Sequence, residues 1–101
     1  MSYLVIAKLP GDVDAFQKAQ ADRPDEFLAI VERAKAAGAI HHRFGLGDGY
    51  ILVVDEWGSP AQFEAFFTDP SLQEFIASAG GDTSSPPDIT VCEALSTVDE
   101  F

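Results

Sequence analysis

The chain has 101 residues, of which 47% are hydrophobic and 23% charged, a size and composition that exclude a disordered tail and allow one ordinary domain over residues 1–101. Its 17 acidic and 6 basic residues leave a formal net charge of -11, which repels phosphate backbones and anionic lipids, so no nucleic acid and no membrane is expected as a partner. No stretch approaches the roughly 20 apolar residues of a membrane span. The single Cys92 cannot form an internal disulfide, which fits a reducing compartment. We therefore expect a cytoplasmic protein.

The first third of the chain predicts a strand followed by helical structure. Tyr3 to Leu9 is a β-rich apolar run that ends at Pro10-Gly11, as a strand entering a turn does. Asp12 to Ala21 has helical composition with Asp12 as a candidate N-cap, and Pro24 suits the first turn of a second helical segment. That segment carries an apolar stripe at helical spacing before Gly38, made of Phe27, Ile30, Val31 and Ala34.

The middle of the chain predicts a β-hairpin. Two apolar runs, Ile40 to Leu46 and Tyr50 to Trp57, flank the Gly-rich segment Gly47-Asp48-Gly49. A short Gly-rich turn between apolar runs is a strong local signal for paired antiparallel strands. We therefore expect strands two and three here.

The remaining elements are a helical region in two parts and a last strand. Ser59 is a candidate N-cap followed by Pro60 in the first turn, and Asp69-Pro70 restarts a helix that Gly80-Gly81 ends. A polar loop then leads into Ile89 to Leu95, the predicted last strand.

The predicted order is strand, helix, strand, strand, helix, strand, which is an α+β, ferredoxin-like βαββαβ antiparallel sheet with its helices on one face. A sheet face open to water carries polar residues at alternate positions, yet the runs from Tyr3 to Ala7 and from Tyr50 to Val54 are apolar at both. A second copy is the simplest cover for the bare face. We therefore expect a sheet-to-sheet homodimer.

The segment from Val53 to Phe66, which reads VVDEWGSPAQFEAF, resembles the third strand, the Trp and the Ser-capped helix of the dimeric α/β-barrel superfamily. This superfamily includes the antibiotic-biosynthesis monooxygenases (the ABM domain) and the haem-degrading monooxygenases. The resemblance implies a ferredoxin-like dimer with a small-molecule pocket between sheet and helices. It leaves the reaction open, because the family contains cofactor-free oxygenases, haem degraders, decarboxylases, isomerases and proteins with no demonstrated reaction.

The haem-degrading branch carries a second Trp in this helical region and an iron-ligating His further on. In this sequence the corresponding positions hold Phe66 and Ile76, and neither side chain can ligate iron. Haem is therefore the third hypothesis for the ligand, and we expect no cofactor and no metal.

The hairpin register selects the candidate catalytic pair. If the turn has two residues, His42 shares a sheet face with Phe44, Asp55 and Trp57, whereas a three-residue turn reverses the faces. A carboxylate beside an imidazole fixes its tautomer and makes it a better proton acceptor, so we predict His42 as a general base oriented by Asp55. The alternative is that His42 is a strand residue paired only to satisfy its hydrogen bonds.

An aromatic wall is expected beside this pair. Five rings are the candidate substrate-binding residues: Phe44, Trp57, Phe63, Phe66 and Phe67. They favour a small apolar, aromatic or polyketide-like ligand, and the first hypothesis is a cofactor-independent, monooxygenase-like enzyme. The alternative hypothesis is a non-catalytic binding or structural dimer in which these rings are core.

Overall fold

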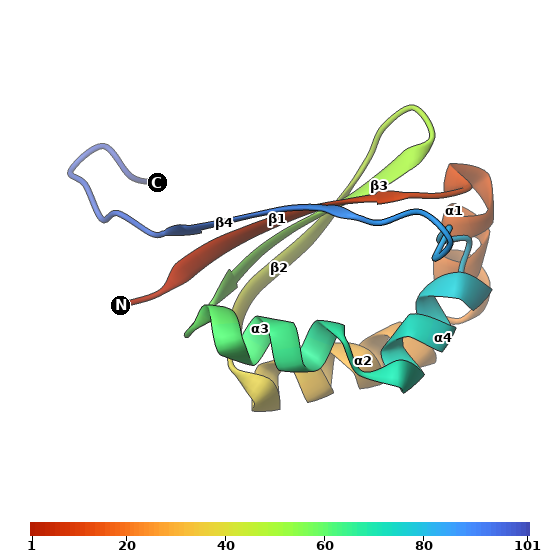
Figure 1. Cartoon of the computed structure of the whole chain (residues 1–101), viewed down its shortest axis with the longest axis horizontal. Coiled ribbons are helices and arrows are strands. Elements are labelled where there is room, and N and C mark those ends of the chain that lie inside the picture. The colour runs from red at the N-terminus through yellow and green to blue at the C-terminus, as the bar shows by residue number, and fades with distance from the viewer.

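A four-stranded antiparallel sheet is the centre of the computed structural model, which describes all residues from 1 to 101. The strands are arranged in the order β2-β3-β1-β4 (Figure 1). Their bounds are Tyr3–Pro10 for β1, Ala39–Leu46 for β2, Tyr50–Trp57 for β3 and Asp88–Glu93 for β4. The last strand ends earlier than predicted, because its partner β1 begins at Tyr3, which pairs with Glu93.

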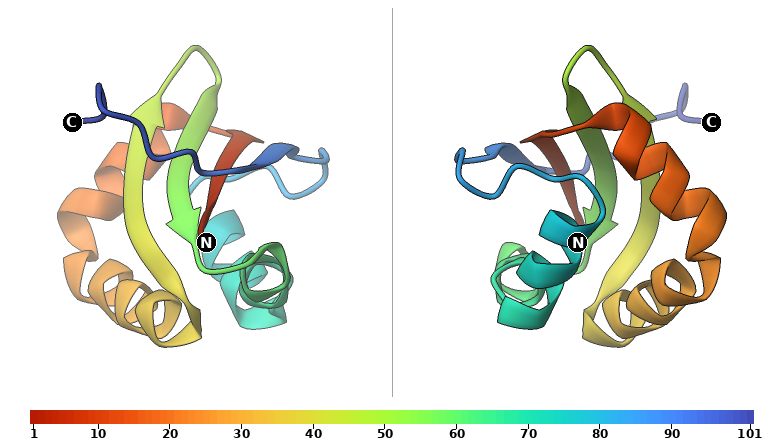
Figure 2. Two further views of the ribbon diagram at one scale, coloured as in Figure 1. Left: turned by 90° about the vertical axis from the view of Figure 1, so that its left-hand side faces the viewer. Right: turned by 90° about the vertical axis from the view of Figure 1, so that its right-hand side faces the viewer.

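The helices all lie on one side of this sheet (Figures 1 and 2), which confirms the predicted ferredoxin-like α+β fold. Their bounds are Val13–Asp22 for α1, Pro24–Ala37 for α2, Pro60–Phe67 for α3 and Pro70–Ser78 for α4.

Three of the helices begin at side-chain caps, two of which, Asp12 and Ser59, the sequence predicts. Asp12 accepts a hydrogen bond from the backbone N–H of Ala15 at 3.0 Å, and Ser59 accepts one from the N–H of Gln62 at 3.2 Å. Asp69 caps α4, where hydrogen bonds from Ser71 lower the pKa of the Asp69 carboxyl. These caps satisfy backbone donors that have no partner within their own helices.

The β2–β3 hairpin has the two-residue turn that the register prediction requires. Leu46 pairs with Ile51, and the Gly47 N–H donates to the Tyr50 carbonyl at 3.0 Å, which leaves Asp48 and Gly49 as the turn. Gly49 has a φ of 77°, a conformation that residues with a β-carbon adopt only at a cost.

A β-bulge at the start of β2 interrupts the regular register that a two-residue turn predicts, in which Ile40 would pair with Trp57. The register shifts between Ala39 and His41, so that Ala39, and not Ile40, lies opposite Trp57. Ile40 is the extra residue of the bulge and stays 50% exposed. From His41 onward the pairing has the predicted register.

The buried core is small and divided. Only 11 of the 101 residues are buried, and seven of the ten hydrophobic ones form two groups. One contains Phe16, Ala19, Ile51 and Ala79, and the other contains Val5, Trp57 and Phe63. Helix α2 has no buried residue, so the helices do not close onto the sheet along its full length.

The sheet face turned away from the helices is partly apolar and uncovered. Leu4, Ile6 and Val54 are 38%, 38% and 44% exposed. Beyond β4, the chain runs past the end of the sheet and away from the helices (Figure 1), with Val98 and Phe101 fully exposed. None of the helices has the length and apolar composition needed to cross a membrane.

Gly80 follows α4 and packs closely against the start of α1, so a substitution at Gly80 tests how closely these two helices pack. It has a φ of 105°, and a β-carbon there would lie 2.8 Å from the Asp12 carbonyl oxygen and 3.0 Å from the β-carbon of Ala15. Gly49, with a φ of 77°, has open space at the same position. We expect Gly49→Ala to cost about 1–2 kcal/mol of unfolding free energy and Gly80→Ala about 1–3 kcal/mol more, since overpacking adds to the strain. Urea denaturation of both variants measures the difference, and equal costs would contradict the close packing.

Candidate functional site

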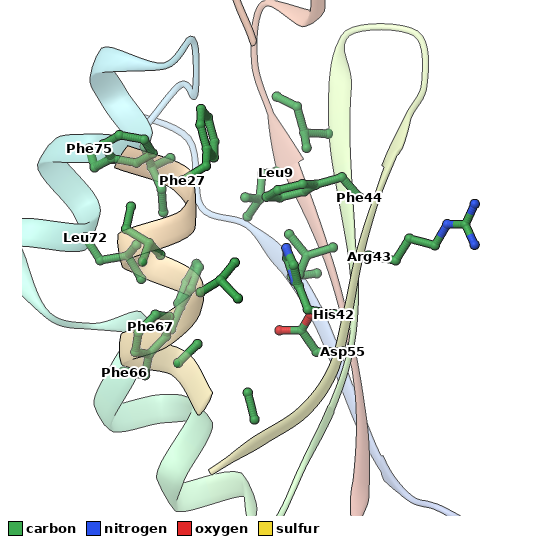
Figure 3. Close-up of a pocket in the computed structure, with 18 of the residues that line it drawn as sticks. Leu9, Phe27, His42, Arg43, Phe44, Asp55, Phe66, Phe67, Leu72 and Phe75 are labelled. Carbon is green, nitrogen blue, oxygen red and sulfur yellow. The ribbon is translucent and has the colours of Figure 1, made fainter. Parts of the chain in front are cut away.

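A cavity of about 540 Å³ lies between the sheet and the helices (Figure 3). It is lined by 29 residues, of which 21 are hydrophobic. This volume is in the range of small-molecule sites, which are typically apolar clefts with a few well-placed polar groups.

The polar centre of the cavity is a hydrogen-bonded chain of three side chains from β2 and β3. Nδ1 of His42 lies 2.6 Å from Oδ1 of Asp55, and the indole N–H of Trp57 donates to Oδ2 of Asp55 at 3.0 Å. Asp55 and Trp57 are two residues apart on β3, so they share one face of the sheet, and His42 is the cross-strand partner of Asp55. Sequence reasoning predicted the first contact and missed the second, although the two-residue spacing in a strand was available as a signal.

This geometry determines which nitrogen of His42 faces the ligand. A carboxylate only accepts hydrogen bonds, so the contact with Asp55 places the proton of the neutral ring on Nδ1. Nε2 then has a free lone pair and makes no hydrogen bond within the protein. The His42 side chain is 32% exposed whereas that of Asp55 is 7% exposed, so the imidazole is accessible from the cavity and the carboxylate is behind it.

Two groups of aromatic rings flank the pair. The first joins β2 to the helices: Phe44 packs edge-on against Phe16 at 4.9 Å between ring centroids, and Phe27 packs edge-on against Phe75 at 4.9 Å. His42 joins this group, with its ring 4.5 Å from that of Phe44. Only Phe44 was predicted as a site residue, because the other three rings read from sequence as ordinary apolar positions of helices.

The second group lies against α3. Trp57 packs against Phe63 and Phe66 with centroids 5.7 Å and 5.5 Å apart, and Phe63 stacks on Phe67 at 5.3 Å. Trp57 and Phe63 are 1% and 6% exposed, so they form the back of the wall. Phe66 and Phe67 are half-buried and offer the surface that a ligand would meet.

The basic residues along the lining do not place their charged groups in the cavity. Arg43 points away from the cavity (Figure 3), and Lys35 lies 3.4 Å from Glu32 with 64% of its side chain exposed. His41 is on the opposite sheet face, 77% exposed and 4.0 Å from Glu56. The cavity therefore offers no fixed positive charge to an anionic ligand.

The two positions that the sequence comparison matched to the haem-binding residues of the haem degraders are also part of this cavity. Phe66 and Ile76 both line it, and neither has an atom that can ligate iron. No group of three or more His, Cys, Asp or Glu side chains is placed to hold a metal ion.

Comparison with known proteins identifies the fold. No protein-family model and no curated protein sequence matches the chain. Among solved structures, Rv0793 from Mycobacterium tuberculosis is 16% identical, with 98% of this chain and 100% of that chain covered and a TM-score of 0.60. A structure described as an antibiotic biosynthesis monooxygenase is 13% identical, with 93% and 99% covered and a TM-score of 0.60. SnoaB, a cofactor-independent oxygenase from Streptomyces nogalater, is 14% identical, with 98% of both chains covered and a TM-score of 0.53.

The chain therefore has the fold of the antibiotic-biosynthesis monooxygenase-like proteins, and the resemblance noted in the sequence is confirmed at this level. Identities of 13% to 16% establish the fold and leave the activity to be argued from the site.

The double acceptor role of Asp55 is tested by Asp55→Asn. The amide oxygen can keep the Trp57 N–H, and the amide NH2 then faces Nδ1 of His42 as a donor, so two hydrogen bonds to a carboxylate are replaced by weaker neutral ones. We expect a loss of about 1–3 kcal/mol in unfolding free energy. Glu74→Gln is the control, since Glu74 is exposed on α4, and it should change stability by less than about 0.5 kcal/mol. Equal effects in urea denaturation would show that Asp55 has no special structural role.

Proposed function

We propose that the cavity binds a small, flat, apolar molecule and that His42 accepts a proton from it, in cofactor-independent, monooxygenase-like chemistry. The observation that carries the proposal is the free Nε2 of His42 in an apolar cavity, with a buried carboxylate 2.6 Å from Nδ1. This is the arrangement of a general base and the group that orients it. The fold shared with SnoaB, a cofactor-independent oxygenase, is consistent with this reaction type.

The chemistry can be written without a cofactor if dioxygen is the co-substrate. Nε2 of His42 removes a proton from an activated methylene group of the substrate, or from the hydroxyl group of its enol form, and the resulting carbanion supplies electrons to dioxygen. The resulting peroxide loses water as His42 returns its proton, so that one methylene group and one dioxygen molecule become one carbonyl group and one water molecule. The apolar walls exclude bulk water from the carbanion, and Asp55 stabilises the imidazolium that forms in the first step.

The aromatic lining favours an aromatic or polyketide-like substrate. Phe44, Phe66 and Phe67 present half-buried rings to the cavity, and ring faces and edges bind flat ligands well. The alternative is a binding protein without a reaction, for which the same cavity and the same His42 contact would suffice. Dioxygen uptake on addition of substrate separates the two, since only the enzyme consumes it.

The role of His42 is tested by His42→Ala, with His41→Ala as the matched control on the other sheet face. With 2-naphthol as the probe, we expect the His42 variant to bind roughly tenfold more weakly, because it loses a buried hydrogen bond. The His41 variant should bind like the parent protein. Isothermal titration calorimetry measures both, and unchanged affinity in the His42 variant would refute the proposal.

We also propose that the protein is a homodimer, packed through the sheet face that carries no helices. The apolar side chains of Leu4, Ile6 and Val54 lie at its centre. The charges around them are mixed, with Lys8 and Arg43 near Glu56 and Asp88. On a chain with a net charge of -11, this nearly neutral face is where a second copy can approach with least repulsion.

The C-terminal tail supports the same proposal. Leu95, Val98 and Phe101 are 82%, 108% and 120% exposed, and the tail extends beyond the end of the sheet (Figure 1). Apolar side chains with no contact in their own chain gain stability if a partner covers them.

We also propose the cytoplasm as the location of the protein. The exposed, unpaired thiol of Cys92 is compatible with that compartment.

The dimer is tested by Ile6→Glu and Val54→Glu, which place an unpaired charge in the proposed interface. Light scattering at micromolar concentration should give the mass of two chains for the parent protein and of one chain for both variants. Leu28→Glu is the control, since Leu28 is 61% exposed on the helix side and its variant should remain a dimer. A single-chain mass for the parent protein would refute the proposal, and truncation after Ala94 measures the contribution of the tail.

A further inference from the structure

Trp57 is the one tryptophan of the chain, and its burial separates it from the rings that meet a ligand. Its side chain is 1% exposed, so a molecule in the cavity has almost none of its surface to contact. Its single polar atom, Nε1, is used 3.0 Å from Oδ2 of Asp55. The structural role of Trp57 toward the site is therefore exerted through Asp55.

The indole N–H restricts how the Asp55 carboxylate can be placed. With Oδ2 bound to Trp57, Oδ1 is the oxygen left to face Nδ1 of His42. A carboxylate held at both oxygens cannot rotate without losing a hydrogen bond in a buried environment, where an unpaired polar group is costly. The same arrangement stabilises the Nδ1–H tautomer of His42, since the other tautomer would set a lone pair against the carboxylate.

We propose that Trp57 is a positioning residue that holds the Asp55 carboxylate in the orientation in which it keeps His42 a hydrogen-bond acceptor toward the cavity, so that the ligand is an uncharged molecule that brings the donor, such as a phenol or an enol. The inference rests on the proposed function for the identity of the site and adds the polarity that the ligand must have. The lack of a cation directed into the cavity disfavours carboxylates and phosphates. A ligand that offered only acceptors, such as an ether or a quinone, would face the lone pair of Nε2.

The first test reads the tautomer directly and needs no ligand. Because Trp57 is the only tryptophan, its N–H can be removed by incorporating 3-benzothienylalanine, in which sulfur replaces the indole nitrogen. Long-range ¹H–¹⁵N NMR at a pH where the ring is neutral then reports the protonated nitrogen of His42, with His41→Ala used for assignment. In the analogue the Asp55 carboxylate is no longer held at Oδ2 and can turn away from Nδ1 of His42. We therefore expect the parent protein to hold the Nδ1–H tautomer and the analogue to contain a measurable fraction of the Nε2–H tautomer.

The second test measures the ligand preference. The parent protein should bind 2-naphthol roughly tenfold more tightly than 2-methoxynaphthalene, which lacks the donor. In the analogue protein this ratio should fall toward one, because the Nε2–H form can donate to the ether. Incorporation of 5-fluorotryptophan, which keeps the N–H, should restore both the tautomer and the ratio, and Trp57→Phe provides a second protein without the N–H if the sulfur analogue does not fold.

The outcomes are distinguishable. An unchanged His42 tautomer in folded protein without the N–H would overturn the positioning role of Trp57. A changed tautomer with equal binding of the two probes by the parent protein would overturn the ligand class. If the tautomer responds while neither probe binds and dioxygen uptake is absent for every substrate offered, the positioning role stands and the proposed function fails.

Discussion

The buried carboxylate of Asp55 is the constraint on which the site depends. A charged group that is 7% exposed is tolerated only when its oxygens are hydrogen-bonded, and here one donor comes from β2 and the other from β3 itself. A slip of one residue in the pairing of these strands would turn His42 to the opposite face and leave the carboxylate without this partner. The two-residue turn at Asp48 and Gly49 sets the register, so a tight turn remote from the cavity is part of the reason that the site exists.

The cavity persists because the helices are held off the sheet by large rings at both ends. Phe16, Phe27, Phe44 and Phe75 form one support and Trp57, Phe63, Phe66 and Phe67 the other. Edge-to-face rings pack well without filling the space between the two groups. The void has an energetic cost, since its lining loses the contacts that a filled core would make. A cost of this kind is expected where an apolar ligand supplies the missing contacts.

Much of this architecture could be predicted from the sequence, for identifiable reasons. Local signals determined the helix starts and the hairpin register: the caps Asp12 and Ser59, the helix restart at Asp69-Pro70 and the Gly-rich turn. Register and strand periodicity together placed His42 beside Asp55. The bulge at Ile40 could not be predicted, because an apolar residue at a strand start gives no sign that it is unpaired. The separation between the helices and the sheet, which creates the cavity, could not be predicted either. It depends on how rings from four separate helices pack together. An apolar stripe in the sequence is the same whether its helix packs tightly on the sheet or lies at a distance from it.

Strand β3 contributes side chains to both faces of the sheet. The proposals about the cavity and about the dimer therefore both involve this strand. Its residues alternate: Val53, Asp55 and Trp57 face the helices, whereas Leu52, Val54 and Glu56 face outward. A partner that covers the outward residues removes water from one side of the strand and strengthens the ladder hydrogen bonds that hold it to β1 and β2. The position of Asp55, and through it the orientation of His42, then depends on a strand that is restrained from both faces. In a solitary chain the same strand would be solvated on one side, and the carboxylate that orients the imidazole would be held less rigidly. Burial of the outer face is thus a physical route by which dimer formation would preorganise the cavity side of the sheet.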